Sequence, residues 1–239
     1  MTKYIASISF GKDSLAMLIK IKELGLPLDE VIYCDIRFDE NTSGEMPLMA
    51  SFIPKAEKIL EEKFGVKVTH VTAVKNFKEQ FYTKKKRGKH VGDYYGFPYG
   101  IGSWCNSYLK LDPLKKYFKQ FEEDVIQYVG IAYGEDTRYE RLGPDQIAPL
   151  YDLKITEEEA VEICKKYDLL SPIYETSFRG GCWFCGKQRI SQLRYLYNNH
   201  KDLWDKLKSM EKDSFNAFIK GTTMDKLEER FEKEKETKE

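Results

Sequence analysis

Near its start the chain passes from a strand through a short turn directly into a helix. An apolar run begins near Tyr4, residues 9–14 read Ser-Phe-Gly-Lys-Asp-Ser, and apolar residues then recur at helical spacing over 13–24. Backbone N–H groups at a helix N-terminus point outward without partners, and the helix dipole adds partial positive charge. Lys12 adds a full charge, and Ser9 and Ser14 add hydroxyl groups. The turn therefore predicts an anion pocket that binds a nucleotide phosphate.

Apolar runs and helical patterns continue to alternate beyond this turn. The runs at 4–9, 30–34, 66–74 and 125–132 predict strands, whereas 13–24, 47–64, 107–121 and a segment starting at Thr156 predict helices. This alternation is typical of βαβ units, so we expect a Rossmann-like parallel sheet with helices on both faces. After residue 186 only helices are predicted, over 190–198, 202–210, 214–220 and 224–235. We therefore expect an α/β nucleotide-binding domain over 1–180 and a Cys-x-x-Cys segment with a helical region over 181–239.

Charge and apolar content leave most classes of partner open. The 39 basic and 39 acidic residues give zero net charge, so bulk electrostatics argue neither for nor against nucleic acid. No apolar run approaches the ~20 residues of a membrane span. The first residues enter a strand at once and leave no room for a signal peptide. We therefore expect a cytoplasmic protein without a membrane partner, and its five cysteines do not indicate a disulfide framework.

Polar residues follow three of the predicted strands. The first strand ends in the loop 9–14, the second in Asp35 and the fourth in the segment 130–138, which contains Arg138. Ligands of open α/β sheets bind at the carboxyl ends of the strands. An acid in the position of Asp35 can accept hydrogen bonds from a ribose or an adenine amine, or it can serve as a simple turn residue. The planar guanidinium of Arg138 is suited to a tetrahedral oxyanion.

Several motifs together resemble a known family. The loop 9–14 is not a Walker A loop, because Ala6 and Asp13 stand where that motif requires Gly and Ser or Thr. It resembles instead the SGGKDS loop of the PP-loop ATP pyrophosphatases, with Phe10 in place of a small residue. Three further segments resemble the phosphoadenosine phosphosulfate reductase-like branch of that superfamily. They are Trp104-Cys105 with Lys110 and Pro113, Gly130 to Arg141, and Pro172-Ile173-Tyr174 followed by Gly181-Cys182 and Cys185.

This resemblance implies an adenine nucleotide α-hydrolase (HUP-type) fold that binds ATP and Mg²⁺. An acceptor would attack the α-phosphate, pyrophosphate would leave, and a sulfur or nitrogen nucleophile would then displace AMP. The implied catalytic residues are Lys12, Lys110 and Arg138. The implied nucleotide-binding residues are Ser9, Phe10, Gly11, Lys12, Asp13, Ser14, Asp35, Gly130, Arg138 and Arg141. Sulfur transfer is the expected second step, as in the DNA phosphorothioation and tRNA thiolation members, with a tRNA, a DNA or a small molecule as acceptor and a sulfur-donor protein as partner.

The cysteines divide into two groups. Cys182 and Cys185 have the two-residue gap that lets both thiolates reach one metal. Cys105 belongs to a motif that the resemblance places near the same edge of the sheet. Together the three predict an iron–sulfur cluster, or zinc with a fourth ligand such as His200; a reduced pair and a reversible disulfide remain as alternatives. Cys34 and Cys164 lie in apolar patterns and are expected in the core.

Three other functions compete with adenylation. A reductase of phosphoadenosine phosphosulfate is disfavoured, because no cysteine follows Cys185 to act as the nucleophile that the resembling reductases carry in their C-terminal tail. A nucleotide-sensing module would bind nucleotide without releasing pyrophosphate. A nucleic-acid-binding protein would use the basic stretch 84–90 and the aromatic residues that follow it over 94–99. That stretch also fits a solvated loop, or a mobile lid over the nucleotide.

Overall fold

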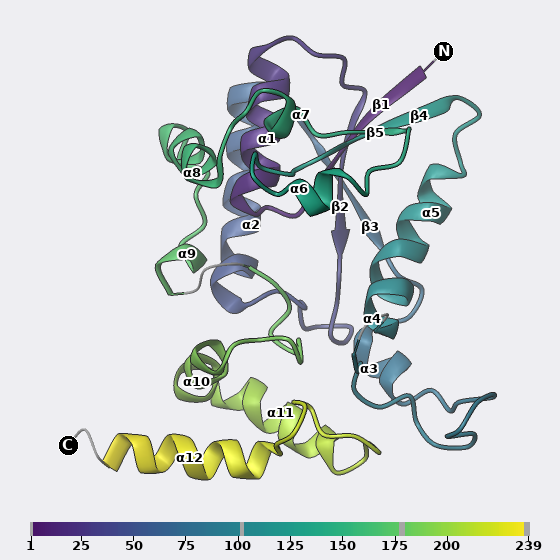
Figure 1. The fold of residues 1–239 in the computed structure, drawn as a ribbon, viewed down its shortest axis with the longest axis vertical. Coiled ribbons are helices and arrows are strands. Elements are labelled where there is room, and N and C mark those ends of the chain that lie inside the picture. The colour runs from purple at the N-terminus through teal and green to yellow at the C-terminus, as the bar shows by residue number, and fades with distance from the viewer. Residues whose placement is uncertain (1, 101–102, 177–179, 237–239) are drawn as a thin grey trace. The chain divides into compact units, whose positions relative to one another are not determined.

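A computed structural model describes residues 2–100, 103–176 and 180–236 (Figure 1). The chain divides into two compact units. Unit 1 comprises Met1–Asp35, Met46–Thr72 and Asp112–Gly180; unit 2 comprises Ile36–Glu45, Ala73–Leu111 and Gly181–Glu239. The sequence predicts a single boundary after residue 180, whereas the units also assign two internal segments to the C-terminal part. An aromatic cluster within unit 2 accounts for this difference, because Phe38 contacts Trp183 with ring centroids 4.5 Å apart and Phe77 contacts Phe184 at 4.1 Å.

Unit 1 contains a five-stranded sheet in the order β3-β2-β1-β4-β5. The strands are β1 (Thr2–Ile8), β2 (Glu30–Asp35), β3 (Val68–Thr72), β4 (Asp124–Val129) and β5 (Gln146–Ile147). Every pairing is parallel, with Ile5 opposite both Glu30 and Gln127. The predicted Rossmann-like α/β fold is thus confirmed. β5 was not predicted, because its two residues form no apolar run.

The helices of unit 1 cover both faces of this sheet. They are α1 (Lys12–Glu23), α2 (Pro47–Phe64), α5 (Asp112–Phe118), α6 (Asp136–Tyr139), α7 (Pro149–Asp152), α8 (Glu157–Lys166) and α9 (Ile173–Thr176). In Figure 1, α1 and α2 lie on one side of the strands and α5 on the other. Leu114 and Tyr117 pack with Phe118 against a buried cluster of Ile5, Ile32 and Val71. The predicted capping box of Thr156 and Glu159 begins α8, and Cys34 and Cys164 are buried as expected.

Unit 2 contains short helices and an aromatic core. Its helices are α3 (Phe77–Phe81), α4 (Trp104–Asn106), the π-helical turn η1 (Ser107–Leu111), α10 (Ile190–Asn199), α11 (Lys201–Glu211) and α12 (Met224–Glu236). The helix predicted over 107–121 is present from Ser107 to Phe118, with η1 as a π-helical turn that runs directly into α5; it ends three residues earlier than predicted. Within the described residues, no helix has the combination of length and apolar character that a bilayer span requires.

The predicted helix over 214–220 is wrong, since the structure has turns and an isolated bridge there. Polar side chains satisfy the backbone instead of a helical ladder. Glu211 accepts from the N–H of Phe218 at 2.8 Å, and the Asn216 amide donates to the carbonyl of Phe97 at 3.1 Å. Side chains of this kind compete with helical hydrogen bonds, which a short periodic pattern does not reveal.

Candidate phosphate-binding site

The loop between β1 and α1 takes its shape from Phe10 and Ser14. Phe10 has a φ of 54°, in the left-handed region that favours glycine. Its side chain is fully buried and meets Tyr33 edge-to-face at 5.0 Å, so it points away from the loop surface. The hydroxyl of Ser14 accepts from the N–H of Ser9 at 3.1 Å and donates to the carbonyl of Gly11 at 2.9 Å. The side chain of Ser14 therefore ties the loop to the first turn of α1.

Gly130 lets the end of β4 approach the start of α1. A Cβ atom at Gly130 would lie 2.8 Å from both the N and the Cα of Ser14 and 3.0 Å from the carbonyl carbon of Asp13. β4 pairs with one side of β1 and β2 with the other, so the loop 9–14 and Gly130 lie at the point where the strand order reverses. Such a switch point is where open α/β sheets bind their ligands.

Two carboxylates hold the ammonium group of Lys12. Its Nζ donates to Asp13 at 2.8 and 3.0 Å and to Glu157, the first residue of α8, at 2.6 Å. The Lys12 side chain is only 10% exposed. Burial alone would lower the pKa of Lys12, but the hydrogen bonds and charges of Asp13 and Glu157 outweigh it, so the pKa is raised. Lys12 is thus a buried, charged ammonium ion whose position α8 fixes.

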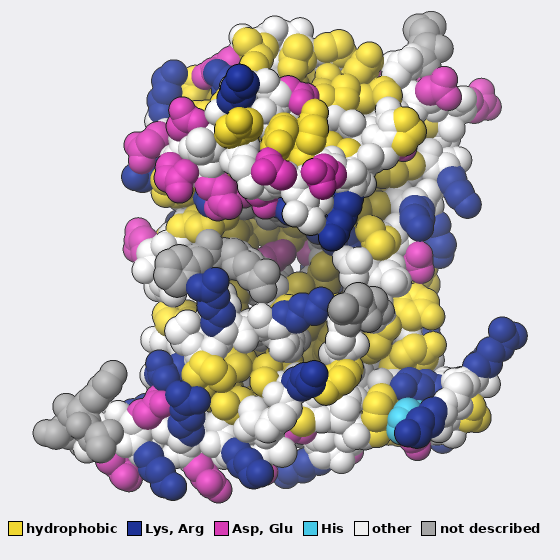
Figure 2. Space-filling model, in the orientation of Figure 1, with side chains coloured by type: hydrophobic (Ala, Val, Ile, Leu, Met, Phe, Trp, Pro, Cys, Tyr) yellow, Lys and Arg dark blue, Asp and Glu magenta, His cyan; other side chains and the backbone are white. Residues whose placement is uncertain are grey.

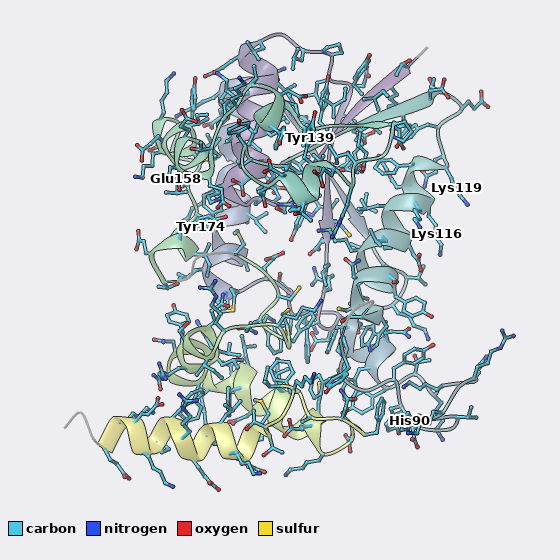
Figure 3. The ribbon with its side chains drawn as sticks, in the orientation of Figure 1. His90, Lys116, Lys119, Tyr139, Glu158 and Tyr174 are labelled. Atoms are coloured by element: carbon cyan, nitrogen blue, oxygen red, sulfur yellow. The ribbon has the colours of Figure 1, made fainter. Side chains whose placement is uncertain are left out.

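The hydroxyl of Tyr174 lies at the N-terminus of α1. It accepts a hydrogen bond of 2.9 Å from the backbone N–H of Lys12, and it would lie 3.2 Å from a Cβ atom at Gly11. Figure 3 labels Tyr174 on α9 and Glu158, the neighbour of Glu157, on α8. Burial raises the pKa of Tyr174, so the phenol is neutral at ordinary pH. A neutral oxygen of the chain itself therefore takes the hydrogen bond that a phosphate oxygen would accept.

Sequence reasoning assigned no role to Tyr174 or Glu157. The only signal for Tyr174 was its place in the Pro172-Ile173-Tyr174 segment, and the only signal for Glu157 was its place beside the capping residue Thr156. Neither pattern indicates a contact with Lys12, which lies 162 residues from Tyr174 and 145 residues from Glu157 along the chain.

The segment after β4 adds a second charged pair. Glu135 accepts from the N–H of Ala132 at 3.1 Å and binds Arg138 Nη1 at 2.6 and 2.8 Å. Burial raises the pKa of Asp13, the hydrogen bond from Lys12 opposes this increase, and the charges of Glu157 and Glu135 add to it. Glu135 is thus close enough for its charge to act on Asp13. Arg138, with a side chain 56% exposed, lies at the edge of this charged group.

The remaining residues predicted for the nucleotide lie on the same unit. Asp35 ends β2 two residues beyond Tyr33, whose register partner is Ile8, so it lies at the carboxyl edge of the sheet. Arg141 is exposed just after α6. A cavity of about 610 Å³ lies at the opposite edge of the sheet, lined by Thr2 and Asp124 at the strand starts, and so is separate from this site.

The three predicted metal ligands lie together in unit 2. Burial raises the pKa of Cys105, with a further increase from Cys185. Burial also raises the pKa of Cys182 well above its ordinary value; Glu45, Cys185 and Cys105 add to the increase and Lys110 opposes it. The thiols are therefore close enough to act on one another electrostatically, and Lys110 belongs with them rather than with Lys12 in unit 1.

These thiols do not form a metal site as they stand. Across residues 2–100, 103–176 and 180–236, no three Cys, His, Asp or Glu side chains are arranged to hold a metal ion. All five cysteines are free, and the raised pKa values keep Cys105 and Cys182 protonated at neutral pH. The predicted fourth ligand, His200, is not grouped with them, and its Nε2 is buried without a hydrogen-bond partner in the described part of the chain.

Comparisons with known proteins add two similarities. No protein-family model matches the chain. An uncharacterised protein of Methanocaldococcus jannaschii is 26% identical over 218 residues, which cover 84% of this chain and 40% of that protein, so the chain spans less than half the length of this relative. Among solved structures, a U34-tRNA thiolase from Methanococcus maripaludis with a [4Fe-4S] cluster matches with a TM-score of 0.46 and 17% identity, over 97% of this chain and 71% of that one.

Proposed function

We propose that unit 1 binds ATP with Mg²⁺ at the N-terminus of α1 and activates an acceptor by adenylation. The observation that carries this proposal is the group at the strand switch point. There the N–H of Lys12 at the start of α1 bonds to Tyr174, the Lys12 ammonium is buried, and Gly130 packs against Ser14. A helix N-terminus with a fixed cation beside it is a site for phosphate oxygens. The parallel sheet places it at the edge where α/β folds bind nucleotides.

The residues around Lys12 suit a ligand that carries its own cation. Asp13, Glu135 and Glu157 bring three carboxylates against the charges of Lys12 and Arg138. Mg²⁺ is commonly bound by one or two carboxylates together with substrate phosphates, so it would arrive with the nucleotide. Lys12 would then exchange a carboxylate for a phosphate oxygen. Asp35, at the end of β2, would accept hydrogen bonds from the ribose or adenine, and Arg138 and Arg141 would bind phosphate oxygens.

In the proposed reaction, an acceptor oxygen attacks the α-phosphorus and forms the new O–P bond while the bond to pyrophosphate breaks. Lys12 neutralises negative charge that builds on the phosphate oxygens. A sulfur nucleophile then attacks the acceptor atom that bears the adenylated oxygen. The bond from this atom to sulfur forms while its bond to that oxygen breaks, and AMP leaves with the oxygen. We assign the thiols of Cys105, Cys182 and Cys185, with Lys110 beside them, to the sulfur-transfer step. A tRNA, a DNA or a small molecule would be the acceptor, and a sulfur-donor protein would supply the sulfur.

Lys12→Ala tests the phosphate-site assignment, with Lys20→Ala as a matched control. Lys20 lies on the same helix and binds Glu23 at 2.7 Å at its exposed side. Calorimetry with ATP and Mg²⁺ should show binding to the wild type and to Lys20→Ala, and none to Lys12→Ala, while circular dichroism shows the same fold in all three. ATP binding by Lys12→Ala at wild-type affinity, or no binding heat with the wild type, would refute the assignment.

A nucleotide-sensing module is a second candidate, favoured by the two carboxylates that already hold Lys12. A sensor needs only binding, whereas an adenylating enzyme must also release pyrophosphate. A pyrophosphate assay with ATP and mixed tRNA separates the two, and sulfite release from phosphoadenosine phosphosulfate would identify a reductase instead. Iron, zinc and sulfide analysis of anaerobically purified protein tests the cysteine group independently, with Cys182→Ser and Cys185→Ser expected to lose any bound metal together.

A further inference from the structure

The basic stretch over 84–90 belongs to a hydrogen-bonded hairpin of unit 2. The N–H of Tyr95 donates to the carbonyl of Thr83 at 2.9 Å, and the N–H of Lys85 donates to the carbonyl of Asp93 at 2.9 Å. Gly88 and Gly92 have φ values of 89° and 91°, which allow the chain to turn at the tip. The basic side chains are thus held on a hydrogen-bonded backbone, and Lys84, Lys86 and Arg87 are exposed to solvent on it.

The hairpin separates its cations into two sets. In an extended strand, residues two apart share a face. Lys85 packs over the ring of Phe215, 4.0 Å from the centroid, and His90 stacks on the same ring at 4.3 Å. Figure 3 labels His90 in this hairpin, and Figure 2 shows Lys and Arg side chains gathered around the histidine there. Lys84 and Lys86 instead line a cavity of about 320 Å³.

Cations and aromatic rings line this cavity together. Its walls include Lys84, Lys86, Arg87, Tyr95 and Tyr108. All three cations are exposed, and no ion pair involves them within the described ranges of the chain. By contrast, Lys208 elsewhere in unit 2 has an acidic partner, with its Nζ 2.8 Å from the carboxylate of Asp225. Positive charge without a partner beside a cavity attracts phosphate.

The two tyrosines form a fixed platform. Their rings meet edge-to-face with centroids 6.0 Å apart and planes at 88°, and Tyr95 also meets Trp104 edge-to-face at 6.3 Å. Tyr108 is 43% exposed and lies on the π-helical turn η1, a rare backbone form that often occurs at functional sites. An aromatic face beside several cations is the combination that binds the bases and backbone of single-stranded nucleic acid.

We propose that this cavity binds a nucleotide of a single-stranded nucleic acid, with the base against Tyr108 and the flanking phosphates against Lys84, Lys86 and Arg87. The volume of about 320 Å³ is at the lower end of the range for small-ligand pockets and admits one nucleotide. Three separate cations exceed the charge of the single phosphate of a nucleoside monophosphate and suit the several phosphates of a strand. Cys105 lies one helical turn before Tyr108, so a strand bound at Tyr108 would reach the thiols. Only the delivery of the strand to these thiols rests on the proposed function.

Fluorescence anisotropy with the full chain and labelled single strands of RNA and DNA of about 12 nucleotides tests the proposal. Replacement of Lys84, Lys86 and Arg87 by Gln should reduce the slope of log affinity against log salt by about 2, since each single-strand phosphate contact contributes about 0.7. Between 50 and 200 mM salt, these cations should account for an affinity loss of about twenty-fold. The matched control replaces Lys115, Lys116 and Lys119, exposed lysines in and just after α5 of unit 1, by Gln.

Tyr108→Ala should weaken binding about ten-fold with an unchanged salt slope, because one stacking contact is lost. Tyr99→Ala is the control, since Tyr99 is 53% exposed and is not among the residues that line the cavity. Tyr108→Leu keeps an apolar side chain without a ring and serves if the alanine variant unfolds. Lys12→Ala should bind the strand as the wild type does, which separates this site from the ATP site.

Three results would overturn the proposal. The first is equal weakening by the cavity and control lysine variants, the second is equal affinity of Tyr108→Ala and Tyr99→Ala, and the third is competition by AMP as effective as that by the unlabelled strand. Binding of RNA alone or of DNA alone would support the cavity and identify which sugar it accepts.

Discussion

The hydroxyl of Tyr174 is the group through which the proposed phosphate site at the loop 9–14 can be tested without changing a charge. Tyr174→Phe removes the acceptor that the N–H of Lys12 uses at 2.9 Å and keeps the ring. A hydrogen bond of this kind contributes about 1 kcal/mol to the free energy of unfolding. For a chain of this size that loss lowers the melting temperature by about 2–4 °C.

The same change should strengthen ATP binding. In the proposed complex a phosphate oxygen replaces the phenol at the N–H of Lys12, so Tyr174→Phe raises the free energy of the empty protein and leaves that of the complex nearly unchanged. A difference of about 1 kcal/mol corresponds to a roughly five-fold lower Kd. Because burial raises the pKa of Tyr174 and keeps it neutral, a charged phosphate oxygen is the stronger acceptor.

Urea unfolding measures the loss of unfolding free energy, and calorimetry with ATP and Mg²⁺ measures the change in Kd, on one preparation. Tyr167→Phe is the matched control, since it removes a hydroxyl that donates to Glu23 at 2.8 Å elsewhere in unit 1. The control should leave ATP affinity unchanged. Weaker ATP binding by Tyr174→Phe, with stability unchanged, would mean that the hydroxyl contacts the nucleotide. It would then not occupy the position of a phosphate oxygen at the N–H of Lys12, and the reasoning would be refuted.

Two further predictions concern the packing around the loop. Gly130→Ala places a methyl group 2.8 Å from backbone atoms of Ser14, so urea unfolding should show a loss of about 1–3 kcal/mol, and unchanged stability would contradict the close approach of β4 and α1. Burial raises the pKa of Cys164 to about 12 from 9.0, so the folded state retains a proton that the unfolded state loses. This one thiol should therefore lower the free energy of unfolding by about 1.6 kcal/mol between pH 9 and pH 10.5, and the total fall should be smaller by that amount in Cys164→Ala.

Local patterns were sufficient to predict the framework of unit 1. Alternating apolar runs gave four of its five strands, and the turn 9–14 gave the start of α1 to within a residue. Gly130 was singled out from the sequence, and the structure gives the reason, since any larger residue meets Ser14. These features depend on neighbours in the sequence or on the geometry of a parallel sheet, which is why they can be predicted from a single chain.

Contacts between distant segments could not be predicted in the same way. Glu157 and Tyr174 reach Lys12 across most of the length of unit 1, and neither has a residue pattern that signals it. In unit 2, Phe77 stacks on Trp104 at 5.2 Å and the ring of Phe38 packs against Trp183 at 4.5 Å. These contacts bring in segments that look irregular in the sequence. Burial of aromatic rings determines these contacts, and periodicity does not reveal which rings will meet.

The group around Lys12 also bears on which anion the loop should prefer. Asp13 and Glu157 already neutralise its ammonium group, and Tyr174 already satisfies its N–H. A ligand must replace these interactions, so a single phosphate gains little beyond what the protein already supplies. A triphosphate with Mg²⁺ brings several charged oxygens to the amides and a cation to the released carboxylates. These contacts should therefore favour ATP over AMP or inorganic phosphate, because only the larger ligand offers partners to both sets of groups.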